Sequence, residues 1–109
     1  MALTHAQPLD VIDIRPLGEG LRSAVTSSVL KTRNLQLMRV VLLAGHGLPE
    51  HHVPGEVSVQ CLEGEVTVTT PGRTCQLAAG QLVVLPGAEP HAVRASQDAT
   101  LLVSILLHP

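Results

Sequence analysis

Residues 80–91 read GQLVVLPGAEPH, a short apolar strand followed by a turn rich in proline and glycine and then by a single histidine. A strand that ends at Pro86 and re-enters a sheet after the turn carries His91 as one of the first side chains of the next strand. Because side chains alternate between the two faces of a strand, His91 and Val93 then point to one side and Arg94 to the other. The pattern therefore places His91 at the head of a strand, on the same face as Val93.

A second group of polar side chains lies upstream, immediately before another predicted strand. Its members are Glu50, His51, His52 and Glu56. The segment that follows, residues 57–61, alternates apolar and polar residues, which is typical of a strand with one face on the core. Adjacent His51 and His52 cannot both point inward from a regular strand, although they can from a loop. Imidazole groups thus occur in two distant segments, each beside a predicted strand.

The spacing in residues 80–91 resembles the second of two motifs typical of the cupin superfamily, in which a glycine, a proline, a further glycine and a histidine stand at fixed intervals. Gly80, Pro86 and His91 occupy matching positions, and Ala88 takes the place of the second glycine. The resemblance covers roughly residues 37–107. It implies a small single-domain, RmlC-like jelly roll with a pocket for a small molecule, with or without a divalent metal ion. It also implies that His91 faces this pocket and that the imidazole groups of the two segments converge there.

The first cupin motif is matched less closely. It usually supplies two histidines separated by one residue, then a carboxylate and then a glycine; if Gly64 is that glycine, the carboxylate position falls on Val57. Valine cannot bind a metal ion, whereas Glu56 is one residue away, and a small bulge at residues 54–55 would turn it inward. The chain thus departs from the three-histidine, one-glutamate ligand set that the resemblance implies.

The histidine positions of this motif depend on the length of the gap before the carboxylate. A four-residue gap places them on Glu50 and His52, and a three-residue gap on His51 and Val53. Divalent Fe, Mn, Ni and Zn accept mixed imidazole and carboxylate ligands, so a mononuclear site of one of these metals is compatible with either register. The candidate metal ligands are His51, His52, Glu56 and His91, with Glu50 as the alternative to Glu56.

The composition limits what the protein can bind. Of the 109 residues, 45% are apolar and 15% are charged, the formal net charge is -2, and Phe, Tyr and Trp are absent. A chain with neither a basic stripe nor an aromatic platform is poorly suited to hold a nucleic-acid backbone or a stacked base. We therefore expect no nucleic-acid partner, and recognition of a small-molecule ligand by shape, aliphatic contact and a few polar groups.

The lack of a recognisable targeting signal and the use of cysteine favour a cytoplasmic protein with no membrane partner. Residues 1–10 lack the charged start and apolar middle of a signal peptide, and no apolar run reaches the ~18 residues of a membrane helix. Cys61 and Cys75 have no CxxC spacing, which favours reduced thiols over a disulfide framework. Cys61 is expected on the inward face of its strand. There it fills apolar space in the core or, alternatively, lines the pocket as a soft ligand or nucleophile.

Short runs rich in Val, Leu, Ile and Thr, bounded by Gly, Pro and Asn, predict an all-β protein. The nine expected strands are residues 10–14, 27–32, 35–43, 56–62, 65–70, 74–77, 81–85, 92–95 and 100–107. Together with the resemblance, they indicate one domain over residues 1–109, a small double-stranded β-helix or jelly-roll barrel of two antiparallel sheets.

The last strand also bears on assembly, because residues 101–107 are apolar on both faces. A strand buried on both sides in so small a protein indicates contact with a second subunit. We therefore expect a homodimer, with residues 1–8 as a loose N-terminal segment or a strap to the partner subunit. Arg39, which interrupts an apolar strand face, would pair with an acidic residue at the dimer edge or with an anionic ligand.

Two functional hypotheses from different classes fit this sequence. In the first, a metal ion held by His91 and by residues near His51 serves an enzyme that acts on a small polar or carbonyl-bearing molecule. In the second, the missing glutamate and the aliphatic interior indicate a non-catalytic module that binds or senses a small molecule without metal. The sequence assigns no catalytic residue and no substrate, because one jelly-roll scaffold hosts many unrelated activities.

Overall fold

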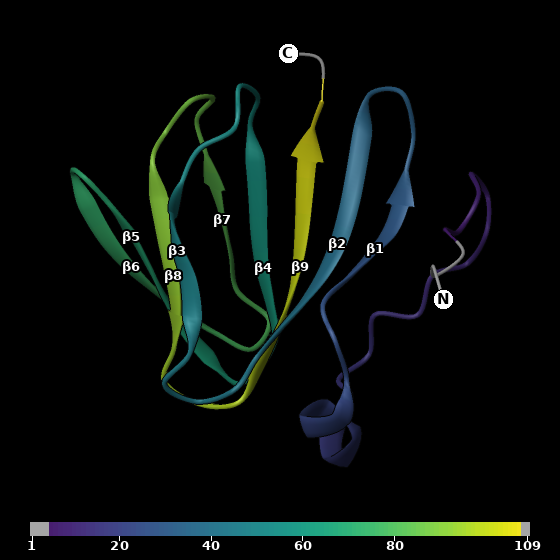
Figure 1. Ribbon diagram of the computed structural model, residues 1–109, viewed down its shortest axis with the longest axis horizontal. Coiled ribbons are helices and arrows are strands. Elements are labelled where there is room, and N and C mark those ends of the chain that lie inside the picture. The colour runs from purple at the N-terminus through teal and green to yellow at the C-terminus, as the bar shows by residue number, and fades with distance from the viewer. Residues whose placement is uncertain (1–4, 108–109) are drawn as a thin grey trace.

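The computed structural model describes residues 5–107 and contains one short 3-10 helix and nine strands in that range (Figure 1). The helix is η1 (Gly18–Ser23), and the strands are β1 (Ser27–Lys31), β2 (Leu35–Leu42), β3 (Gly47–His51), β4 (Val57–Glu63), β5 (Glu65–Thr70), β6 (Arg73–Ala78), β7 (Leu82–Leu85), β8 (His91–Ala95) and β9 (Ala99–Leu106). Nowhere in residues 5–107 is a helix long and apolar enough to cross a membrane.

The strands form two antiparallel sheets that face each other as a β-sandwich (Figure 1). One sheet has five strands in the order β1-β2-β9-β4-β7, and the other has four in the order β3-β8-β5-β6. Many neighbours in space are distant in sequence, as in the pairing of β2 with β9 and of β5 with β8. The prediction of an all-β fold with two antiparallel sheets is confirmed.

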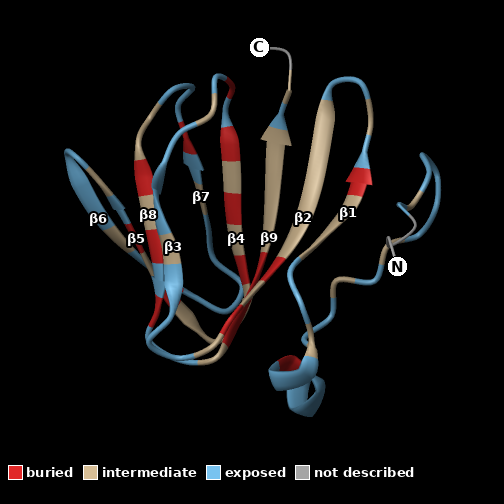
Figure 2. Cartoon of the chain, viewed as in Figure 1, coloured by how far each residue is buried: buried red, intermediate tan, exposed pale blue. Residues whose placement is uncertain are grey.

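Apolar side chains from both sheets form the core. Figure 2 shows buried residues on strands of both sheets. In β4, the inward residues Val57, Val59 and Cys61 are 2%, 2% and 0% exposed, and the residues between them are half-buried. This alternation confirms the predicted phase of the strand. Cys61 is an apolar filler of the core, and burial raises the pKa of its thiol.

The strand expected over residues 10–14 is absent from the structure. The chain from residue 5 to residue 17 instead runs beside β1 as an irregular segment, with one bridge between Ala6 and Leu30. A run of β-branched residues becomes a strand only when a neighbour and a core are available to it. Val11 is 99% exposed, so it has no such core among the described residues. Of the loose segment expected over residues 1–8, residues 1–4 lie outside the described range.

β3 is not among the strands expected from the sequence. Its five residues, GLPEH, do not alternate between apolar and polar, and they include Pro49, which has no N–H to donate to a sheet. Proline is tolerated where a strand lies at the edge of a sheet. β3 is such an edge strand and pairs with β8 alone. The strand ends at His51, one of the candidate metal ligands.

The carboxylate of Glu63 joins the N-terminal segment to the end of the sandwich. It accepts hydrogen bonds from the N–H groups of Leu17 and Gly18, at 2.7 and 3.1 Å, and from the hydroxyl group of Thr100 at 2.8 Å. Burial alone would raise the pKa of Glu63, but these hydrogen bonds and the nearby positive charge of Arg39 outweigh it and hold the pKa below its ordinary value. The carboxylate therefore stabilises the fold in its ionised form.

Replacement of Glu63 by glutamine is expected to lower the free energy of unfolding by about 1–2 kcal/mol at neutral pH, because an amide has only one oxygen that accepts hydrogen bonds. The pKa of Glu63 is lower in the folded state, so its contribution is complete above the unfolded-state pKa and disappears as the pH falls through the folded-state pKa. Urea unfolding of both proteins at neutral and at strongly acidic pH measures this. A stability difference that stays constant between the two conditions would show that the charge of Glu63 contributes nothing.

Candidate ligand-binding site

A cavity of about 270 Å³ lies between the two sheets. It is lined by Thr26, Met38, Val40, Leu48, Pro49, His51, Val59, His91, Val93, Leu101, Val103 and Ile105. Nine of these twelve residues are apolar, and the other three are Thr26, His51 and His91. An aliphatic container with a few polar groups is the usual composition of a site for a small organic molecule.

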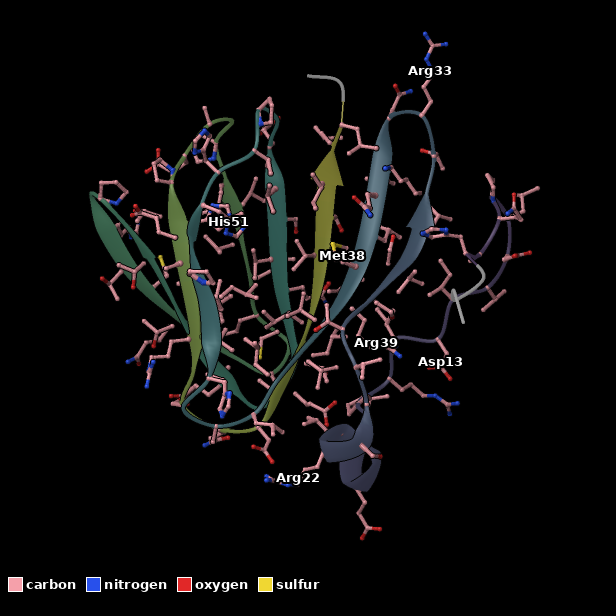
Figure 3. The ribbon with its side chains drawn as sticks, viewed as in Figure 1. Asp13, Arg22, Arg33, Met38, Arg39 and His51 are labelled. Carbon is pink, nitrogen blue, oxygen red and sulfur yellow. The ribbon has the colours of Figure 1, made fainter. Side chains whose placement is uncertain are left out.

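Two imidazoles meet at this cavity, one from each of the two sequence segments that carry the prediction. His91 begins β8 and is 4% exposed, whereas His51 ends the neighbouring strand β3 and is exposed. The two residues are paired in the register of these strands, and their ring centroids lie 4.4 Å apart with an interplanar angle of 56°. Figure 3 shows the side chain of His51 on the inner side of its sheet. The predicted convergence of the two segments is therefore seen for this pair of residues.

Each ring is held by a backbone carbonyl group through the same ring nitrogen. Nδ1 of His91 lies 2.9 Å from the carbonyl oxygen of Glu89, and Nδ1 of His51 lies 3.1 Å from that of Pro49. A carbonyl oxygen only accepts hydrogen bonds, so Nδ1 carries the proton and donates in both rings. In the neutral form each ring then has an unprotonated Nε2, whose lone pair can accept a hydrogen bond or bind a metal ion.

The turn that leads into β8 packs against the upstream segment. Ala88, at the position of the second glycine in the cupin motif, has a φ angle of 63°, in the left-handed region that favours glycine. Its N–H donates to the carbonyl oxygen of Val53 at 2.8 Å, and a side chain on Gly87 would collide with the carbonyl oxygen of Pro54. The two sequence segments are thus in direct contact at this end of the sandwich, which holds the two imidazoles side by side.

The structure brings together two of the four predicted metal ligands. His51 and His91 line the cavity, whereas His52, Glu56 and the alternative Glu50 are exposed and are not among the lining residues. In the part of the chain that the structure describes, no three His, Cys, Asp or Glu side chains are grouped so that they could hold a metal ion. The cavity therefore does not fit a metal centre with three or more protein ligands.

Met38 and Thr26 also line the cavity, although neither is a candidate site residue in the sequence. Met38 has the same inward phase as Val40 in β2, so strand alternation alone could have placed it. Thr26 precedes β1, and no periodic pattern marks it; its Oγ1 accepts a hydrogen bond from the N–H of Val41. In Figure 3, Met38 is on the five-stranded sheet and His51 is on the four-stranded one, so the cavity has walls from both sheets.

Arg39 lies outside the cavity, because it alternates with the lining residues Met38 and Val40 along β2. Its Nη2 donates to the backbone carbonyl oxygen of Asp13. Among the described residues, Arg39 therefore bonds to a backbone group of the N-terminal segment rather than to an acidic side chain.

Two antiparallel sheets with a histidine-lined cavity between them define a class of small jelly-roll proteins. This chain belongs to the cupins: the family described as "Cupin domain" matches residues 38–106. A comparison with curated proteins gives no match.

Several solved structures share the fold. A cupin superfamily protein from Desulfitobacterium hafniense superposes with a TM-score of 0.78 at 16% identity, over 94% of this chain and 100% of that chain. An RmlC-like cupin from Desulfovibrio desulfuricans gives a TM-score of 0.70 at 26% identity, over 95% and 96% of the two chains. A protein from Thermus thermophilus gives 0.69 at 30% identity, over 78% and 84%. These similarities support the fold and the family, and they assign no activity to the cavity.

Proposed function

We propose that this chain is a single-domain small-molecule-binding cupin, in which the two sheets act as a short barrel around a largely aliphatic ligand. The observation that carries the proposal is the lining of the cavity, which is apolar apart from Thr26 and the imidazole pair of His51 and His91. Apolar walls supply most of the affinity for such a ligand, because each Å² of apolar surface removed from water contributes roughly 25 cal/mol. The imidazoles would fix the orientation of one polar group through their Nε2 atoms.

His51 and His52 provide a matched test of this proposal, because they are adjacent and both exposed but only His51 lines the cavity. We expect a thermal-shift screen of short-chain alcohols, ketones and carboxylic acids to give ligands that stabilise the wild-type protein. His51→Ala should weaken their binding by about two- to tenfold, the value of one net hydrogen bond. His52→Ala should bind as the wild type does.

His91→Ala should reproduce the loss, measured as the ligand-induced shift relative to the melting temperature of the same variant without ligand. His91 is 4% exposed, so this variant also loses buried contacts, and His51→Ala is the safer of the two. A screen that yields no ligand for the wild type, or ligands that bind equally well to both the His51 and the His52 variants, would refute the proposal.

A bound divalent metal ion is the second candidate, and one observation favours it. Both imidazoles donate Nδ1–H to a backbone carbonyl, the arrangement by which metal-bound histidines are commonly oriented. A site of the predicted composition would add His52 and Glu56, or Glu50, to the pair, which requires residues 52–56 to turn inward. Such an ion would supply Lewis acidity.

Metal content separates the two candidates. Untagged protein, supplied in turn with Fe, Mn, Ni and Zn and then freed of excess ions, should retain far less than one ion per chain if the cavity binds an organic ligand alone. Stoichiometric metal that is lost in His51→Ala but kept in Arg33→Ala, a change at an exposed residue outside the cavity, would favour the metal-dependent reading.

We also propose that the protein is a homodimer, built on the outer face of the five-stranded sheet. On this sheet Leu82, Val84 and Leu106 are 55%, 53% and 41% exposed, and a twofold axis would allow the same apolar face to cover itself. Val84→Lys should shift the protein to monomer in size-exclusion chromatography with light scattering, because the axis brings two like charges together. Gln76→Lys, on β6 in the other sheet, should leave the mass unchanged, and a wild-type monomer would contradict the assembly.

A further inference from the structure

Thr26 is the third polar residue of the cavity, and it lies on the wall opposite the imidazoles. His51 and His91 belong to β3 and β8 of the four-stranded sheet, whereas Thr26 immediately precedes β1 at the edge of the five-stranded sheet. In Figure 1, β1 and β3 stand on opposite sides of the space between the sheets. The two walls of the cavity thus each include a polar residue.

The hydroxyl group of Thr26 is oriented by the backbone. Its Oγ1 accepts a hydrogen bond of 2.9 Å from the N–H of Val41 in β2. A hydroxyl group has one proton to donate besides its two acceptor sites. Among the described residues, the Thr26 proton is not used in any hydrogen bond, and Thr26 is exposed.

The two polar walls have opposite hydrogen-bonding character. The carbonyl groups of Pro49 and Glu89 take up the Nδ1 protons of the imidazoles, so the free Nε2 atoms are acceptors. Thr26, whose Oγ1 already accepts from the backbone, has a donor to offer. The surface between them is apolar and includes Met38 and Val103.

We propose that the ligand of this cavity is a short aliphatic molecule with two polar groups, a hydrogen-bond donor that meets the imidazoles and an acceptor that meets Thr26. A diol, a hydroxy ketone or a hydroxy ester has this chemistry. The cavity volume is about 270 Å³, which is the volume that roughly nine water molecules occupy in liquid water. A short diol or hydroxy ketone fits in such a volume. The inference rests on the proposed function, because it names the ligand class of the same cavity.

The test compares 1,6-hexanediol with 1-hexanol as probes, since they have the same chain and differ by one hydroxyl group. Methyl NMR titration of the cavity residues measures both dissociation constants in the wild type, Thr26→Val and Thr26→Ser. Thr26→Val keeps the shape and removes the hydroxyl group, and Thr26→Ser restores it. The ratio to compare is the dissociation constant of 1-hexanol divided by that of 1,6-hexanediol. We expect this ratio to fall by about two- to tenfold in Thr26→Val, because one net hydrogen bond to the diol is lost. It should return to the wild-type ratio in Thr26→Ser.

Thr74→Val is the matched control, because Thr74 is exposed on β6 and does not line the cavity. The inference is overturned if 1-hexanol binds in a His51-dependent manner but the ratio is the same in Thr26→Val and the wild type. In that case the proposed function survives without a role for Thr26. If neither alcohol perturbs the cavity methyl groups of the wild type, the inference fails; the proposed function fails with it only if the wider screen of alcohols, ketones and carboxylic acids also yields no ligand.

Discussion

Replacement of Gly64 by alanine is expected to lower the free energy of unfolding by about 3 kcal/mol or more, and the melting temperature by about 12 °C or more. Gly64 joins β4 to β5, where the chain passes from one sheet to the other, and its φ angle is 81°. A left-handed backbone costs any residue with a Cβ atom roughly 1–2 kcal/mol. Here the added methyl group would also collide with the backbone carbonyl oxygen of Asp98 and lie 2.8 Å from the Cα atom of Ala99. Neither neighbour can yield without moving the start of β9.

Gly80 provides the control for this prediction. Its φ angle is 88°, so Gly80→Ala carries the same backbone penalty, but no heavy atom lies within 4 Å of the added methyl group. Gly80→Ala should therefore cost about 1–2 kcal/mol, clearly less than Gly64→Ala. Thermal and urea unfolding measure both values. If the free energy of unfolding fell equally in the two variants, the collision with β9 would cost nothing and the backbone angle would account for the whole effect.

Eight of the nine strands lie where the short apolar runs bounded by turn residues predict them. β5 has the predicted limits, and the other seven differ from prediction by no more than one residue at either end. The errors fall where local composition and tertiary context disagree. Residues 10–14 have a strand-like composition but no sheet partner, whereas β3 has a poor composition and is held in place by β8. Pairing partners of this kind are set by the whole fold, which a local pattern does not encode.

The candidate site, like the strands, could be predicted from the sequence only in part. His91 follows from the local chemistry of its turn, because one strand re-entering a sheet has a fixed alternation. The choice between His51 and His52 depends on the register of β3 against β8, which shifts between Leu48 and His51. Such an irregularity reverses the face on which a side chain emerges, so alternation could not show which of the two neighbours lines the cavity. Thr26 was beyond prediction for a related reason, since it reaches the cavity only through the packing of one sheet edge against the other.

Val103→Phe is expected to abolish ligand binding, with affinity lowered by at least about tenfold, while the fold is kept. Val103 is half-buried in β9 and lines the cavity, so a phenyl ring placed there has open space to occupy. Filling a cavity with apolar atoms adds contacts, and the melting temperature should stay the same or rise. The measurement is the thermal shift without ligand and with any ligand found in the screen. A ligand that binds Val103→Phe as tightly as the wild type does not occupy this cavity.

Val66→Phe is the same chemical change at a position without free space. Val66 is 0% exposed in β5 and does not line the cavity, so the larger ring must displace its neighbours, at a cost of about 1–3 kcal/mol. The two variants should thus have opposite effects: Val103→Phe loses the ligand and keeps its stability, whereas Val66→Phe loses stability and, while folded, keeps the ligand. If Val103→Phe were destabilised as much as Val66→Phe, the space between the sheets would be too small to hold a ligand, and the function proposed here would lose its structural basis.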